Sequence, residues 1–323
     1  MKRLFRGLLL IVLAVSLSGC GLMGNQNNDD SNSEQQTPTS SDSDLSGSLE
    51  DGSVDYTESS SVHKDMRIIS LMPSNTEILD ALGVSEYIVG ISSVDTYPKP
   101  LVEDEDIAKI DSFEFDAEQV LDLEPTHIFS HETSRDMHEG VLSDIEKATG
   151  AEIIYVEDAE SIEEIYGTVT DIGEVLSLPE EAEEVNRELQ ESIDDTVRTY
   201  EDESPVSVFV QISPYPDVFT AGENTFIDDV INTIGAENIF TDIEGFSQVS
   251  AEGLVDRDPD YVVSIIDGYD AGQLEADVNQ FTSSEHLSMK DREHQCALDP
   301  DTLSRPGPRI DEGMEQLAAC VFE

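Results

Sequence analysis

The sequence predicts an α/β protein with two lobes joined by one long helix. Short apolar segments alternate with helical segments on both sides of a polar stretch, a pattern typical of parallel sheets covered by helices. Within that stretch, residues 179–200 repeat apolar side chains at helical spacing over roughly 33 Å of helix at 1.5 Å per residue, longer than a strand crossover needs. One segment also recurs on the two sides. We therefore expect two related α/β lobes and a spine helix.

The N-terminus indicates export. Lys2 and Arg3 precede an apolar run, residues 8–17, that is too short to span a bilayer comfortably. The Leu-Ser-Gly sequence before Cys20 resembles the lipobox of bacterial-type lipoproteins. This resemblance implies cleavage before Cys20 and attachment of lipid to its thiol. An uncleaved anchor and an ordinary signal peptide are the alternatives.

A polar spacer follows the N-terminal segment. Its residues are mostly Ser, Asp, Asn, Gln and Thr, which cannot bury enough apolar surface to offset the entropy of ordering the chain. We therefore expect disorder there and structure from about Met66 onward. The predicted organisation is a signal peptide at 1–19, a lipidated cysteine with an acidic, Ser-rich spacer at 20–65, an N-terminal lobe at 66–177, a spine helix at 178–203 and a C-terminal lobe at 204–323.

The N-terminal lobe begins with a strand predicted at residues 67–71. Residues 73–76, Pro-Ser-Asn-Thr, predict a turn and a helix cap, so the first helix is expected at 77–82, where Gly83 ends it. A second strand is predicted at 87–92. The alternation of strands and helices continues to about Val156.

Two helices connect the lobes. Ser161 and Glu164 have the spacing of a capping box, which predicts a helix starting after Ser161. Pro179 suits the first turn of the spine helix, because proline needs no hydrogen-bond partner there. A strand at 206–212 then opens the C-terminal lobe.

An internal repeat relates the two lobes. The segment "FDAEQVLDLEPTHIFSH" at 115–131 aligns without gaps on "VSAEGLVDRDPDYVVSI" at 249–265. Each copy predicts a capped helix, a proline-containing turn and a strand, although such units also resemble one another by chance. Glu118 and Glu252 occupy matching positions in the first helical turn, where a carboxylate also interacts favourably with the helix dipole.

The charge excludes some partners. The chain has 72 acidic and 16 basic residues, a formal net charge of −56, which repels nucleic acid and anionic lipid headgroups. The carboxylates are spread too evenly to mark one acidic site. They indicate a solvated acidic surface of the kind that halophilic proteins carry.

The three cysteines have separate predicted roles. With Cys20 lipidated, Cys296 and Cys320 remain for a disulfide in an extracytoplasmic compartment, and a free pair is the alternative.

Catalytic and metal-binding patterns are scarce. The sequence lacks a nucleophile elbow, a P-loop, a dinucleotide-binding glycine motif and a zinc-protease motif. His127 and His131 lie four residues apart on a predicted strand, about 13 Å at 3.3 Å per residue, too far to share a metal. We predict no catalytic residue, no cofactor and no metal site.

Six stretches, in order along the chain, carry a family resemblance. Together they resemble the class III substrate-binding proteins of ABC importers, which bind cobalamin, haem or siderophores, and the cobalamin-binding branch most of all. The resemblance covers residues 66–322. The stretches are "RIISLMPSNTEILDALG", "VGISSVDTYP", "AEQVLDLEPTHIFSH", "FTAGENTFIDDVINTIGAENIF", "QVSAEGLVDRDPDYVV" and "LSRPGPRI".

The resemblance implies a ligand cleft between the lobes, where flat aromatic faces would pack on a large chelate. It places Arg305 at the mouth of this cleft, where the stiff Pro-Gly-Pro turn would aim it at ligand oxygens, and leaves Arg309 as a structural ion-pair partner. An ion-pairing role for Arg305 and core positions for the aromatic residues are the alternatives. The other ligand-binding positions implied are Tyr97, Phe113, His131, Phe219 and Phe246.

The resemblance also implies partners. We expect a monomer, tethered to the membrane by lipid, that delivers its ligand to a permease dimer with ATPase subunits and does no chemistry on it. Glu118 and Glu252 would dock onto permease arginines, one from each lobe.

The ligand predicted from the resemblance is a corrinoid. The absence of Trp, and a histidine at position 131 where the cobalamin binder has Trp, weaken cobalamin relative to haem or a ferric siderophore. An extracytoplasmic enzyme or chelatase and a surface adhesin are the alternatives from other classes.

Overall fold

The first half of the folded chain alternates strands and helices as predicted. The computed structural model describes residues 65–114, 116–284 and 286–323, so the predicted signal peptide, the lipidated Cys20 and the spacer up to residue 64 lie outside the described residues. The elements of this half are β1 (Ile68–Ser70), α1 (Pro73–Ala81), β2 (Ile88–Ser92), α2 (Lys99–Glu103), β3 (Ala108–Ile110), α3 (Ala117–Asp122), β4 (His127–His131), α4 (Arg135–Thr149), β5 (Glu152–Val156), α5 (Ile162–Val175) and α6 (Pro179–Tyr200).

The second half resumes the alternation after α6. Its elements are β6 (Ser207–Gln211), β7 (Phe219–Ala221), α7 (Phe226–Thr233), β8 (Glu237–Asn238), β9 (Phe246–Gln248), α8 (Ala251–Arg257), β10 (Tyr261–Ser264), α9 (Ala271–Phe281), β11 (Gln295–Ala297), α10 (Pro300–Leu303) and α11 (Ile310–Phe322).

Each half is built on a parallel sheet. The first sheet has the strand order β3-β2-β1-β4-β5 and the second β11-β10-β6-β8, while β7 and β9 form a separate two-stranded antiparallel sheet. The predicted α/β fold with parallel sheets is therefore confirmed.

The helix starts follow local chemistry. α6 begins at Pro179 as predicted, but α1 begins at Pro73 and not at Glu77, because Pro73 itself takes the first helical position and no side chain caps the helix. The Ser161 hydroxyl accepts from the Glu164 amide at 3.3 Å. The Glu164 carboxylate accepts from the Glu160 amide, so only one bond of the predicted capping box forms.

Helices cover both faces of each sheet. Alternate strand residues point to opposite faces, so Ile68 and Phe129 pack with α1 and α5, whereas Ile69 and Ile128 pack with α3 and α4. In the second sheet Val208 packs toward α7 and α11. The next residue, Phe209, points to the other face and packs toward α8 and α9.

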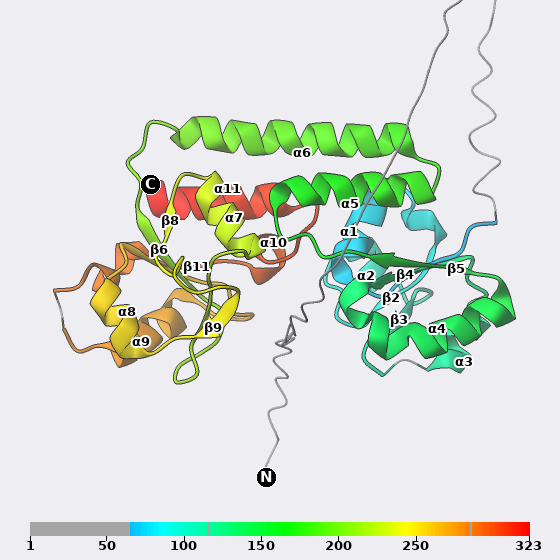
Figure 1. The fold of residues 1–323 in the computed structure, drawn as a ribbon, viewed down its shortest axis with the longest axis horizontal. Helices are drawn as coiled ribbons and strands as arrows, with labels where there is room; N and C mark the ends of the chain where they lie inside the picture. The colour runs from blue at the N-terminus through cyan, green and yellow to red at the C-terminus, as the bar shows by residue number, and fades with distance from the viewer. Residues whose placement is uncertain (1–64, 115, 285) are drawn as a thin grey trace, which may run out of the picture. The chain divides into compact units, whose positions relative to one another are not determined.

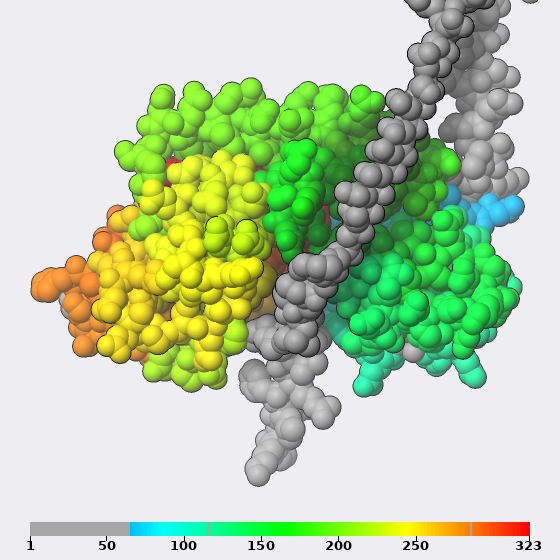
Figure 2. Space-filling view, in the orientation of Figure 1, coloured from blue at the N-terminus to red at the C-terminus, as the bar shows by residue number. Residues whose placement is uncertain are grey.

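One apolar cluster runs through both halves and beneath α6. It joins residues of β1, α1, α5 and α6 to residues of β6, α7 and α11, so the halves share a core. α6 packs on α5 and on α11, which lie one after the other beneath it (Figure 1). The space-filling view shows α6 above the surfaces of both halves (Figure 2). Among the described residues, no helix is long and apolar enough to cross a membrane.

The sequence repeat corresponds to a repeat of structure. The orders β5-β4-β1-β2 and β11-β10-β6-β8 are equivalent, with the repeat strands β4 and β10 in the same place. Both copies also turn through a left-handed residue before their proline, Glu124 with φ 47° and Asp258 with φ 40°. The two positions differ by the same 134 residues that relate the sequence copies, since 258 − 124 = 134.

Candidate ligand-binding site

Three of the five most exposed large apolar residues in the described part of the chain lie on loops that follow parallel strands. The carboxyl ends of parallel strands are where α/β proteins bind ligands, and exposed apolar groups there mark a binding surface. Val94 follows β2, Phe113 follows β3 and Tyr215 follows β6. The large apolar residues with the most exposure are Val94 at 52%, Phe113 at 50%, Met137 at 61%, Tyr215 at 37% and Phe246 at 52%.

The β7–β9 sheet presents two of the predicted aromatic residues on one face. Ala221 pairs with Phe246 and Phe219 pairs with Gln248, so Phe219 and Phe246 are diagonal neighbours on the same side. Gly222 allows the backbone at residue 243 to pack closely beside β7, because a Cβ there would lie 2.0 Å from the Ile243 carbonyl oxygen. Phe219 is half-buried and Phe246 is exposed.

Tyr215 is an aromatic residue that the sequence interpretation missed. Asp277, a buried carboxylate on α9, fixes the loop by accepting from the Tyr215 amide at 3.1 Å and from Gln211 Nε2 at 2.7 Å. The available signal was the dipeptide Tyr215-Pro216 after a strand of the second half, which matches Tyr97-Pro98 after a strand of the first.

His131 lies at the end of β4 with both ring nitrogens occupied. Its Nε2 is 2.5 Å from Asp158 Oδ1 and its Nδ1 is 2.6 Å from the Thr133 hydroxyl. The ring is 5% exposed. Within the described part of the chain, no group of three or more His, Cys, Asp or Glu side chains could hold a metal ion.

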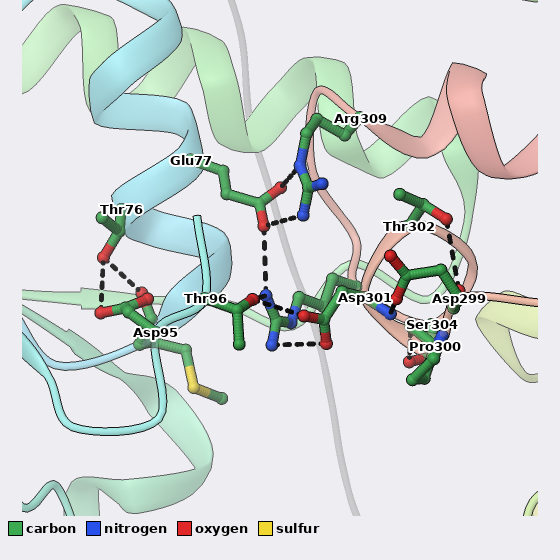
Figure 3. A network of polar contacts seen from close by, with 12 residues as sticks. Thr76, Glu77, Asp95, Thr96, Asp299, Pro300, Asp301, Thr302, Ser304 and Arg309 are labelled. Atoms are coloured by element: carbon green, nitrogen blue, oxygen red, sulfur yellow. Dashed lines mark hydrogen bonds and ion pairs between the residues drawn. The ribbon is translucent and has the colours of Figure 1, made fainter. Parts of the chain in front are cut away.

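A buried carboxylate joins the two halves. Glu77 on α1 accepts from Arg309 Nη2 at 2.8 Å and from Arg309 Nε at 3.1 Å, and its side chain is 2% exposed (Figure 3). Tyr97 covers the other side of Arg309, with its ring centre 4.2 Å from Cζ. The predicted structural ion pairing of Arg309 is confirmed, but the partner expected within the second half is instead Glu77 of the first half, 232 residues away in sequence.

Arg305 belongs to the same network. Its guanidinium lies 2.6 Å from Asp301 Oδ1 and 3.3 Å from Glu77 Oε1, and it donates to the Thr96 hydroxyl at 3.0 Å. Thr96 also bonds Asp301 directly. These contacts show the ion-pairing role that was the alternative for Arg305, and contact with a ligand stays a prediction.

Asp95, beside this network, has a raised pKa. Burial raises the pKa of Asp95 to about 7, against the smaller opposing effects of a hydrogen bond from Thr76 at 3.3 Å and the charge of Arg305. Its Oδ1 atom is buried without a partner.

The contact between the halves leaves little room at this level. A cavity of about 10 Å³ remains between His131, Asn75 and Pro306, enough for about one water. A ligand larger than a water molecule does not fit in this cavity.

Glu118 and Glu252 occupy equivalent helix starts. Both are exposed, in the first turns of α3 and α8. Each helix has a side-chain cap: Asp116 Oδ1 accepts from the Glu118 amide at 2.9 Å, and the Ser250 hydroxyl accepts from the Gly253 amide at 3.0 Å.

The predicted disulfide is present. Cys296 on β11 is bonded to Cys320 on α11. It ties the last helix to an edge strand of the second sheet.

The chain is similar to several known proteins. The sequence pattern described as periplasmic binding protein matches residues 68–280. An uncharacterized ABC transporter substrate-binding lipoprotein of Bacillus subtilis is 31% identical over 97% of this chain and 95% of its own. A vitamin B12-binding protein of Vibrio cholerae is 26% identical over 79% of this chain and 88% of its own.

A solved structure has a similar fold. It is described as a possible iron-binding, periplasmic solute-binding protein of Staphylococcus epidermidis. It superposes with a TM-score of 0.72 and 33% identity, covering 80% of this chain and 98% of its own.

Proposed function

The chain belongs to the periplasmic binding protein family and is an extracytoplasmic substrate-binding protein of ABC transporters, and we propose that it captures a corrinoid and delivers it to an importer. Members of this family are solute-binding proteins that work with a permease and an ATPase. The proposal assigns the chain no catalytic residue.

The exposed aromatic side chains carry the proposal. Phe113 in the first half and Tyr215 in the second leave apolar faces in water on loops at the carboxyl ends of parallel strands, and Phe246 leaves one on strand β9. Such faces can bury the ring of a large chelate through dispersion and area burial, without matched hydrogen bonds. The similarity to a vitamin B12-binding protein supports a corrinoid as that chelate.

A ferric chelate, either haem or a siderophore complex, is the second candidate. The similarity to the structure named as a possible iron-binding protein favours it. Because both ring nitrogens of His131 already have protein partners, this histidine is not poised to ligate iron.

The remaining predicted residues have assigned roles within the proposal. Tyr97, Phe219, His131 and Arg305 would complete the walls of the site, behind the exposed side chains. Glu118 and Glu252 would dock the two halves onto the permease, and lipid on Cys20 would tether a monomer to the membrane, as the relative named a lipoprotein supports.

Direct titration tests the proposal. The purified protein is titrated calorimetrically in high salt with cyanocobalamin, haemin and a neutral ferric siderophore, and the ligand is recovered unchanged afterwards. We expect saturable binding, tightest for cyanocobalamin. Tighter binding of haemin or the siderophore would replace the corrinoid with the second candidate, turnover of the ligand would show an enzyme, and binding of none would refute the proposal and favour an adhesin.

A further inference from the structure

We propose that the ligand site accepts neutral and positively charged chelates and rejects negatively charged ones. This inference rests on the proposed function of the same loops and adds the charge class of the ligand to it. Three features carry it: every described arginine is engaged, three of the four described lysines are engaged, and exposed carboxylates lie close in sequence to the exposed aromatic residues.

The arginines are engaged by protein oxygens throughout the described residues. Binding an anion away from water requires a positive group that is free to pair with it. Six of the arginines hold partners within their own half: Arg67 with the Leu123 carbonyl, Arg135 with Glu132, Arg187 with Glu184 and Glu191, Arg198 with Asp195, Arg257 with Asp242, and Arg292 with Glu275.

Arg305 and Arg309, the pair nearest the candidate site, are also neutralised. Both contact Glu77, and Arg305 contacts Asp301 as well, so two guanidinium groups face two carboxylates (Figure 3). To bind an anion, either arginine would have to leave the nearly buried Glu77, and a carboxylate stranded without its partner is costly. The network therefore offers no free positive charge to a ligand.

Three of the four described lysines are engaged by protein oxygens, and one is not. Lys109 donates to the Leu101 carbonyl, Lys147 pairs with Asp144, and Lys290 bonds Asn279. Lys99, the exposed first residue of α2, is the one described lysine for which the structure gives no such contact.

Exposed carboxylates lie close in sequence to the exposed aromatic residues. Exposed Asp111 and Glu114 lie on either side of Phe113, and exposed Glu244 lies two residues before Phe246. Like charges close together repel, and salt screens contacts inside a binding site far less than distant ones. Aromatic faces, in contrast, attract cations. The surface that would hold the ligand thus favours a positive chelate and disfavours a negative one.

Two matched ligand series isolate charge from shape. The corrinoid series is aquacobalamin, cyanocobalamin and a monocarboxylate of cyanocobalamin, which are positive, neutral and negative. The hydroxamate series is ferrioxamine B with its pendant amine free, acetylated or succinylated, which follows the same order. Calorimetric titration of the purified protein in 0.15 M and 1 M salt measures each affinity (about physiological and strongly screening conditions).

We expect the anion of the series that binds to be at least about tenfold weaker than its neutral member at both salt concentrations. An anion that binds as tightly as the neutral member would overturn the charge inference and leave the proposed function intact. Failure of every member of both series would instead overturn the proposed function, and the charge inference with it.

A pair of variants locates the selectivity. Glu114→Gln with Glu244→Gln removes two carboxylates beside the aromatic faces and should raise the affinity of the anion several-fold more than that of the neutral member. Glu180→Gln with Glu181→Gln makes the same change of charge on α6, away from these loops, and serves as the control. An equal gain from both pairs would show that the overall charge, and not this site, sets the preference.

Discussion

At the scale of single residues, Phe113 and Phe246 differ from the other phenylalanines that the structure describes. Each is about half exposed, at 50% and 52%, so neither contributes much to the core. Burying such a side chain against a ligand is worth on the order of 1.5–3 kcal/mol. Removing either side chain should therefore weaken ligand binding and change the stability of the fold little.

We expect Phe113→Ala and Phe246→Ala each to weaken ligand binding by roughly 1–2 kcal/mol and to leave the melting temperature nearly unchanged. Calorimetric titration and thermal unfolding of each variant measure the two effects. Phe129→Ala, in the core of the first sheet, is the control that should unfold the protein more easily. A large drop in melting temperature for Phe113→Ala and Phe246→Ala would show that these side chains belong to the core and not to a binding surface.

Asp95 makes stability depend on pH. Its pKa is about 7 in the folded protein and 3.8 in the unfolded chain, so the folded protein holds this proton more tightly. As the pH rises from 3.8 to about 7, the unfolded chain releases the proton first, and the free energy of unfolding falls by an amount on the order of a few kcal/mol. Above that range the contribution stays constant.

Asp95→Asn removes this titration. We expect the variant to gain stability relative to the parent between pH 5 and pH 8, whatever its absolute stability, because the parent loses the contribution of Asp95 over that interval. Urea unfolding of both proteins at the two pH values gives the difference. A difference that is the same at both values would mean that Asp95 titrates normally.

At the scale of elements, the sequence already predicted much of the fold. Alternation and helical periodicity predicted the strands and α6, because burial on two faces or on one stripe imposes those patterns. The helix start at Pro73 was mistaken for a turn, since the tetrapeptide 73–76 has good capping residues and an equally good first-turn proline. The repeat was visible because α3 and α8 each need a capping residue, Asp116 or Ser250, and the same left-handed turn before a proline.

The contacts of the candidate site were less predictable. Glu77 is one of 72 acidic residues, and nothing local distinguishes it from the solvated ones. Its partners Arg305 and Arg309 are 228 and 232 residues away, so the pairing depends on how the two halves pack. The exposure of Tyr215 depends on the loop that Asp277 fixes, which is also a tertiary contact.

The matched helices α3 and α8 predict how the protein docks. Glu118→Arg with Glu252→Arg should leave ligand affinity intact and abolish uptake by the reconstituted importer, because a receptor must hold both halves. Glu183→Arg with Asp194→Arg on α6 is the matched control. Equal loss from both pairs would indicate general electrostatics, and no loss from the first pair would remove these glutamates from docking.

At the scale of the whole molecule, Glu77 fixes one half against the other. Removing one partner of a buried ion pair leaves the others uncompensated, which costs 3–5 kcal/mol when burial is complete. The two arginines keep 15% and 18% of their side chains exposed, so the cost here should be lower.

We expect Glu77→Gln to lower the free energy of unfolding by roughly 2–4 kcal/mol and to speed hydrogen exchange in residues 95–98 and 300–309. Urea unfolding and exchange mass spectrometry measure both effects. Glu183→Gln, an exposed change on α6, should alter neither. Unchanged exchange in the Glu77 variant would show that the shared apolar core alone holds the halves together.

The repeated order of strands makes the single chain a pseudo-dimer. Two copies of one structural unit, each with its own capped helix and left-handed turn, lie in one polypeptide. A receptor composed of two identical subunits can then use one recognition surface twice, so the chain would meet a two-fold symmetric partner without being a symmetric dimer itself. Where the halves differ, as in the β7–β9 sheet and the disulfide of the second half, the protein is free to match a ligand that has no symmetry.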